Sequence, residues 1–322
     1  MAIVPGVTGQ AAPSGFRWVA RVVVLGGFVL TVWLCGPRAA TVLAARLRPD
    51  PGLSPPVELD RVGFVERPEW MDKAVLVAVS ASLSPWLQGE IPILDDDAAR
   101  RLAAGLKSVP WVRDVGVDRA FPDHLRLRVD LRRPVLAVRD ADGQALCLVD
   151  RDGVMLPFVD TEVPVTYLHR EGGAPTMANE PGQVARDPRV IAAAAVALEW
   201  RDDLAPRVAG CPRLLEVDAT NLGERWLRGP SYPEIRVKLA RNDGAPVIFA
   251  YDRPVHSPLA RVPNDTKATV LGNILGRHPG LQGLVAGDLR FPRRWADYLQ
   301  PRAEGVRDPN GPWADLNVPR GG

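Results

Sequence analysis

The chain has 322 residues, enough for two domains with buried cores. Its 40 lysine and arginine residues nearly balance 38 aspartate and glutamate residues and are interleaved with them, so no single-sign patch indicates nucleic acid as a partner. The three cysteines, Cys35, Cys147 and Cys211, are far apart, which argues against a local zinc site and leaves open a Cys147–Cys211 disulfide or two free buried thiols.

An uncharged apolar run from Val22 to Cys35 predicts a transmembrane anchor at residues 18–37. A short cytoplasmic tail would precede it at residues 1–17, and a Pro-containing linker would follow at residues 38–56. A cleaved signal peptide is the alternative interpretation of the same run. Arginines flank the run on both sides, so the positive-inside rule does not decide its orientation.

The next region, residues 57–132, has signals for a strand, two helices and two further strands in that order. An alternating strand covers Val57 to Val62, and a helix starting near Pro68 ends before Pro85. The second helix begins at a run of aspartates, Asp95 to Asp97, which favours a helix cap over a metal site. Strands at Val112 to Arg119 and His124 to Leu131 complete a β-α-α-β-β unit, which can form a helix pair on a three-stranded sheet.

Several short motifs in this unit resemble the POTRA domain of the bacterial cell-division FtsQ/DivIB family. They are Val109-Pro110-Trp111-Val112, Val117 to Pro122, Leu125 to Val129 and Arg133-Pro134-Val135. Arg132-Arg133-Pro134 stands where the family usually shows Glu-Arg/Lys-x-Pro, with Asp130-Leu131 in place of the glutamate, a departure that keeps the register. Trp111 is expected in the core of this domain, at the seam between helix and sheet.

Residues 133–301 predict a β-rich domain with flanking helices, and residues 302–322 a disordered tail. A hairpin turns at Asp150 to Gly153, a helix opens at Asp187-Pro188, and a last helix starts near Asn264. Strands are predicted at Leu214 to Val217, Arg225 to Leu227, Glu234 to Leu239, Val247 to Tyr251 and Leu284 to Phe291. The helix Lys267 to Leu275 and the segment Asp288-Leu289-Arg290-Phe291 are similar to the closing part of the family's β domain.

The expected fold class is therefore α+β: an N-terminal transmembrane helix, a β-α-α-β-β POTRA domain, then a mixed β-rich domain. No catalytic or nucleotide-binding motif is present, and the four histidines are scattered. We therefore expect no catalytic residues, no metal, no cofactor and no small-molecule substrate. A POTRA-bearing envelope assembly or transport factor and a membrane-anchored envelope enzyme remain the alternatives.

The resemblance implies a non-catalytic divisome scaffold that links early and late division proteins at the septum. It implies a single-pass type II protein of the inner membrane with its bulk outside the cytoplasm, contacting lipid through the anchor. FtsB-like and FtsL-like proteins would bind by β-strand addition to the last strand, which would turn after Phe291 and return as Trp295 to Leu299. The candidate partner-binding residues are Leu289, Arg290, Phe291, Trp295 and Tyr298. The alternative is that Trp295 and Tyr298 only cover the core.

Overall fold

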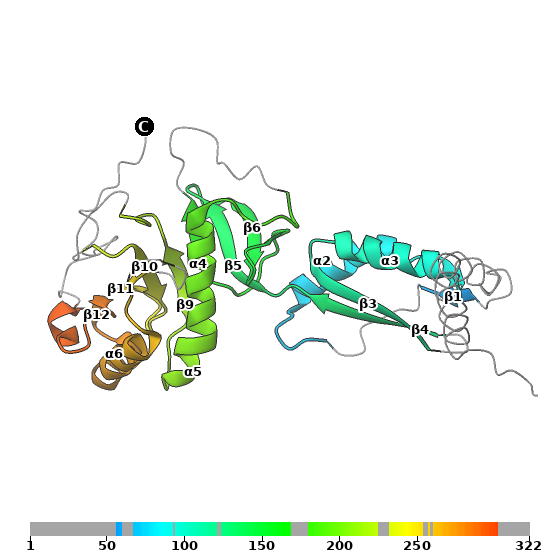
Figure 1. Cartoon of the computed structure of the whole chain (residues 1–322). Helices are drawn as coiled ribbons and strands as arrows, with labels where there is room; N and C mark the ends of the chain where they lie inside the picture. Colours follow the sequence, from blue (N-terminus) through cyan, green and yellow to red (C-terminus); the bar gives the residue numbers. More distant parts are fainter. Residues whose placement is uncertain are drawn as a thin grey trace, which may run out of the picture.

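The computed structural model describes residues 56–59, 67–92, 94–120, 124–168, 180–224, 232–253, 257 and 260–301. They form two units that follow one another along the chain (Figure 1). The smaller unit runs from β1 (Pro56–Glu58) to β4 (His124–Leu131), and the larger one from β5 (Pro134–Asp140) to β13 (Gln300–Pro301). The buried apolar side chains fall into two clusters, one centred in each unit.

Both long helices of the smaller unit begin at an aspartate. The carboxylate of Asp72 accepts a hydrogen bond from the backbone N–H of Val75 at 2.8 Å and starts α2 (Lys73–Leu83), later than the predicted start at Pro68. Asp95 caps α3 (Asp96–Ser108) by accepting hydrogen bonds from two backbone N–H groups at 2.9 and 3.0 Å. The predicted cap at the aspartate run is therefore confirmed.

The sheet of the smaller unit differs from the prediction. The two strands predicted after α3 are confirmed as the hairpin of β3 (Val112–Ala120) and β4, but the described residues form two separate two-stranded sheets instead of one of three strands. β1 pairs antiparallel with β2 (Glu90–Pro92), a strand between the helices that the sequence pattern does not predict. Gly89, with a φ of 85° that other residues rarely adopt, lies directly before β2, and its carbonyl accepts a hydrogen bond from the N–H of Leu59 at 3.0 Å, which extends the contact between the two segments. Residues 60–66, the rest of the predicted first strand, lie outside the described residues.

The core of the smaller unit lies between the helices and the hairpin. Trp111 is fully buried in it, which confirms the expectation for this residue. Leu102 and Leu106 of α3 and Val75 of α2 belong to the same buried cluster. Side chains from the larger unit, Ala137, Leu148 and Leu156, belong to this cluster too, so the two units share apolar contacts.

The larger unit is built on one mixed sheet of nine strands in the order β13-β12-β11-β10-β9-β8-β5-β6-β7. The pairs β5–β8, β8–β9 and β11–β12 are parallel, and the other pairs are antiparallel. The remaining strands are β6 (Ala145–Asp150), β7 (Met155–Leu156), β8 (Val165–Leu168), β9 (Leu214–Asp218), β10 (Ile235–Leu239), β11 (Val247–Asp252) and β12 (Leu284–Asp288). The predicted hairpin at Asp150 to Gly153 is confirmed, and the strand predicted at Arg225 to Leu227 lies outside the described residues.

Helices α4 (Pro188–Glu199) and α6 (Asn264–Arg277) pack against this sheet, as Figure 1 shows. Asp187 caps α4 by accepting a hydrogen bond from the N–H of Arg189 at 2.9 Å, and Pro188 stands in the first turn, as predicted. A π-helical turn, η3 (Trp200–Leu204), and α5 (Ala205–Arg207) continue α4. Alanine and valine side chains of α4 are buried among sheet residues such as Val217 and Val237.

The expected fold class needs correction. Among the described residues no helix is long and apolar enough to cross a membrane, and the nine-stranded sheet dominates the fold. The transmembrane segment expected at residues 18–37 lies outside the described residues, as do residues 1–17, 38–55 and 302–322. Cys147 and Cys211 are free thiols, and burial raises their pKa values to about 12 and about 11.

Candidate partner-docking edge

The nine-stranded sheet has one covered end and one open end within the described residues. At the β7 end, the N–H of Met155 donates to the carbonyl of Gln183 at 2.9 Å, and the N–H of Gly182 donates to the carbonyl of Met155 at 2.7 Å. The segment around Val184 thus occupies the outer side of β7. At the other end, β13 has β12 as its only neighbour among the described strands. An unpaired edge presents backbone donors and acceptors to a further strand.

The route of the chain to this edge differs from the prediction. The predicted return strand at Trp295 to Leu299 is wrong: Trp295–Tyr298 forms a 3₁₀ turn, η5, and the pairing with β12 is made by Gln300–Pro301. The strand predicted to reach Phe291 ends at Asp288, where the carboxylate accepts a hydrogen bond from the N–H of Arg290 at 2.9 Å and bends the chain. A pair of Arg294 and Asp297 at 2.9 Å spans η5.

The structure brings three of the five candidate partner-binding residues together. The Phe291 and Tyr298 rings stack at 4.5 Å between centroids, and the Arg290 guanidinium lies 5.2 Å from the centroid of Phe291. Tyr298 is 38 % exposed. Leu289, in contrast, is fully buried in the core, and Trp295 packs against that core from the side.

Gly287 lets the chain close over β12. A side-chain carbon added there would collide with the ring of Phe249 and would lie 3.2 Å from the side chain of Leu299. Leu299 immediately precedes β13, so the small residue on β12 allows the last strand to lie flat against the sheet.

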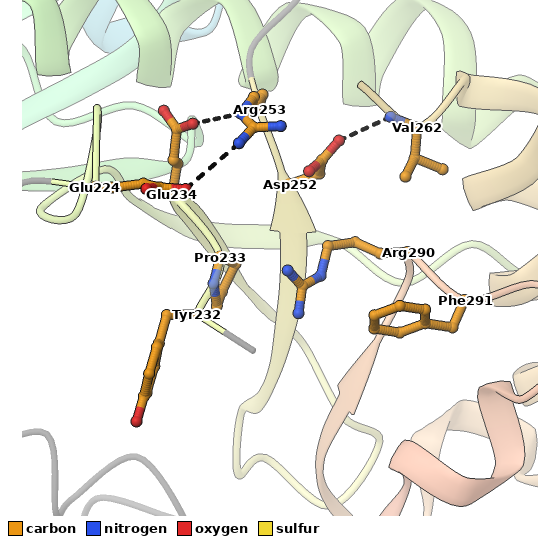
Figure 2. A pocket seen from close by; sticks show the side chains of 9 residues that line it. All are labelled: Glu224, Tyr232, Pro233, Glu234, Asp252, Arg253, Val262, Arg290 and Phe291. Atoms are coloured by element: carbon orange, nitrogen blue, oxygen red, sulfur yellow. Dashed lines mark hydrogen bonds and ion pairs between the residues drawn. The ribbon is translucent and has the colours of Figure 1, made fainter. Parts of the chain in front are cut away.

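A cavity of about 370 Å³ lies beside this edge, at the carboxyl ends of the parallel strands β11 and β12 (Figure 2). Its walls include Glu224, Glu234, Asp252, Arg253, Arg290 and Phe291. In open sheets with parallel strands, ligands commonly bind at this end of the strands. The cavity and the docking edge share Arg290 and Phe291.

Ion pairs organise the charged walls of the cavity. Arg253 pairs through Nε with Glu234, and its Nη2 lies 3.6 Å from a carboxylate oxygen of Glu224. The hydrogen bond that Arg253 donates to Glu234 and the nearby carboxylates raise the pKa of Arg253 above its usual value, against the lowering effect of burial. Arg290 is held by Asp288 at 2.7 Å.

Backbone strain marks the same cavity. Glu224 and Asp252 have φ angles of 54° and 107°, a region that residues with side chains rarely adopt. The carboxylate of Asp252 accepts a hydrogen bond from the N–H of Val262 at 2.7 Å, which fixes its direction. Strained residues persist where surrounding structure holds them, and they gather at functional sites. The sequence did not predict this cavity because its residues come from five separate stretches of the chain that form no motif.

No protein-family model matches the chain, and a search of curated proteins finds no match. Within the described residues, no group of three or more histidine, cysteine, aspartate and glutamate side chains is placed to hold a metal ion.

Proposed function

We propose that this chain is a non-catalytic scaffold that holds other cell-division proteins together at the septum, as its resemblance to the FtsQ/DivIB family implies. The observation that carries the proposal is the contrast between the two ends of the large sheet. β13 is open among the described residues, whereas the β7 end is covered by the segment around Val184. A scaffold that binds by strand addition needs such an edge on a stable sheet.

The partners in this proposal are FtsB-like and FtsL-like proteins, and a strand from one of them would extend the sheet beyond β13. Main-chain hydrogen bonds would provide affinity, and side chains next to the edge would provide selectivity. The side chains suited to provide this selectivity are Arg290, Phe291 and Tyr298, because arginine and aromatic side chains are enriched among residues that dominate binding energies. Leu289 is not part of this surface, since it is buried.

A matched pair of tyrosines tests the docking edge. Tyr298 and Tyr167 are 38 % and 37 % exposed, but Tyr167 lies on β8 in the middle of the sheet. In a capture experiment with the FtsB-like and FtsL-like proteins of the same organism, Tyr298→Ala should weaken binding at least about tenfold, while Tyr167→Ala should not. Equal capture by both variants would contradict the proposal.

Hydrogen exchange gives an independent measure of how the partner binds. If a strand is added, backbone amides near Gln300 should exchange more slowly in the complex, whereas amides of β7 should not change. Protection confined to a helix or to the smaller unit would point to another binding mode.

We propose the inner membrane, with the bulk of the chain outside the cytoplasm, as the location. Support for this comes from the family resemblance of the motifs around Trp111 and Arg290. External protease should then degrade the chain in spheroplasts but not in intact cells. Recovery of an intact, protected chain in the cytosolic fraction would contradict the location without bearing on the docking edge.

A further inference from the structure

In the cavity beside the docking edge, more hydrogen-bond acceptors than donors are available to a ligand. Each of the three guanidinium nitrogens of Arg253 already contacts an oxygen: Nε that of Glu234, Nη1 the carbonyl of Ala260 at 2.9 Å, and Nη2 that of Glu224 at 3.6 Å. Nε and Nη2 of Arg290 are engaged by Asp288. The two arginines of the cavity are therefore committed to carboxylates at its walls.

Asp252 keeps an open acceptor position. One of its carboxylate oxygens, Oδ2, accepts the N–H of Val262, and no donor from the described residues is found on the other. Three carboxylates, those of Glu224, Glu234 and Asp252, line the cavity with two guanidinium groups, so its lining carries an excess of negative charge. Outside the lining, Asp288 pairs with Arg290, and the buried ammonium of Lys267 interacts electrostatically with Asp252. A buried or partly buried excess of this kind favours a cationic group.

Two aromatic rings belong to the wall. Tyr232 lies at the rim and is 37 % exposed. Phe291 lies on the side of the docking edge, where Tyr298 stacks on it and the Arg290 guanidinium lies 5.2 Å from its centroid, so Tyr232 is the ring that a further cation could contact. Figure 2 shows Asp252 between the group formed by Glu224, Glu234 and Arg253 and the pair of Arg290 and Phe291. A carboxylate combined with aromatic rings is a common way to bind an ammonium or guanidinium group.

We propose that this cavity binds the lysine or arginine side chain of a partner segment docked on the neighbouring edge, with Asp252 as the counter-ion. The identity of the occupant rests on the proposed function, because Phe291 borders both the cavity and the edge. The basic side chain would set the position of the added strand along β13, a selectivity that backbone hydrogen bonds alone do not provide.

The test uses the 322-residue chain and small probes that do not require strand addition. Saturation-transfer NMR would compare the methylamides of N-acetyl-lysine and N-acetyl-arginine with those of N-acetyl-glutamate and N-acetyl-leucine. Asp252→Asn removes the charge but retains an acceptor for the N–H of Val262, and asparagine tolerates a positive φ. Asp297→Asn is the matched control, because that exposed carboxylate pairs with Arg294 outside the cavity.

The basic probes should give the stronger signals, and Asp252→Asn should weaken their binding about tenfold while Asp297→Asn leaves it unchanged. Stronger binding of the glutamate probe, or basic probes that bind both variants equally, would overturn the proposal. Thermal unfolding of both variants checks that the fold is kept; if Asp252→Asn unfolds, Glu224→Gln takes its place with the same expectation. The docking edge is tested separately by Tyr298→Ala, so either idea can fail alone.

Discussion

The ammonium group of Lys267 lies 3.7 Å from the centroid of the Tyr251 ring, and both side chains are fully buried. The Lys267 nitrogen has no hydrogen-bond partner among the described residues. The hydroxyl of Tyr251 donates to Glu199 at 2.6 Å, and Arg261 pairs with the same carboxylate at 2.9 Å. A charged group is thus held between α6 and the sheet by the face of a ring and by the nearby carboxylates of Glu199 and Asp252.

This arrangement predicts a distinctive pH dependence. Burial lowers the pKa of Lys267 from 10.5 to about 8, so the folded chain binds this proton less tightly than the unfolded chain does. Below pH 8 Lys267 is charged in both the folded and the unfolded chain, so the full free-energy cost of burying its charge lowers the stability of the fold. As the pH rises towards 10.5 the folded form loses the proton first, and the cost disappears.

Replacing Lys267 with methionine removes this effect. The variant should be more stable than the parent at pH 7, and its advantage should shrink by on the order of 3 kcal/mol between pH 7 and pH 10.5. Urea unfolding at several pH values measures the difference. Lys73→Met, at an exposed position of α2, is the control and should show no such trend. The prediction would be contradicted if the difference in unfolding free energy between the Lys267 variant and the parent stayed constant with pH.

Two glycine-to-alanine changes should have opposite effects. Gly287→Ala brings a methyl group against the Phe249 ring and Leu299, and it should cost about 1–3 kcal/mol of unfolding free energy and loosen β13. Gly272→Ala, in α6, meets no atom within 4 Å and should stabilise the chain by about 0.5–1 kcal/mol. Chemical denaturation measures the unfolding free energy of both variants. If Gly287→Ala leaves it unchanged, the edge of the sheet can shift to make room for the added methyl group.

Trp111→Ala should destabilise the smaller unit strongly. The ring is fully buried in its core, so the change should cost about 3–5 kcal/mol. Trp86→Ala, at a position that is 41 % exposed, should cost clearly less. Tryptophan fluorescence during unfolding reports both values. Equal losses for the two variants would place Trp111 outside the cooperative core.

Asp72 should couple the two units in a pH-dependent way. Its carboxylate caps α2 and accepts a hydrogen bond from the hydroxyl of Thr161 in the larger unit at 2.5 Å. That bond, followed by the one from Val75, lowers the pKa of Asp72 below 3.8. Its stabilisation is therefore present above pH 3.8 and is lost as the pH falls through the lower folded value.

Asp72→Ala should then cost about 1 kcal/mol at neutral pH, as the loss of a helix cap does. Thr161→Val should keep the cap but reduce the acid sensitivity of unfolding below pH 4, because the Thr161 hydroxyl is the largest cause of the lowered pKa. Urea titrations between pH 3 and pH 6 test both variants. If Thr161→Val leaves the fall in unfolding free energy below pH 4 unchanged, the contact between the two units does not contribute to stability in solution.

Local signals were enough to predict many elements of this fold. The caps at Asp95 and Asp187, the β3–β4 hairpin and the turn at Asp150 each depend on residues close in sequence, and all are found where expected. Such features are decided by side chains that satisfy nearby backbone groups. The strands β9, β10 and β11 were predicted as short strands separated by turn signals, and they are found at those places.

Contacts between segments that lie far apart in the sequence could not be predicted from such local signals. β1 pairs with β2 across about thirty intervening residues, and the 3₁₀ turn at Trp295–Tyr298 has no side-chain cap that would mark it in the sequence. Leu289 alternates with Arg290 as an edge residue would, yet it packs into the core because its N–H bonds to the carbonyl of Ala250 at 3.1 Å. The cavity is likewise assembled by the parallel pairing of β11 with β12 across α6.

The covered end at β7 has a consequence for self-association. A sheet with two free ends can stack copies head to tail without limit, whereas a sheet with one free end can join a second copy only through a two-fold axis. Because the segment around Val184 occupies the β7 end, two copies meeting at β13 would form a pair in which the described residues offer no uncovered end of this sheet to a third copy. Association through this sheet therefore disfavours fibres made of many copies. A different protein bound at β13 would also prevent the pairing of two copies.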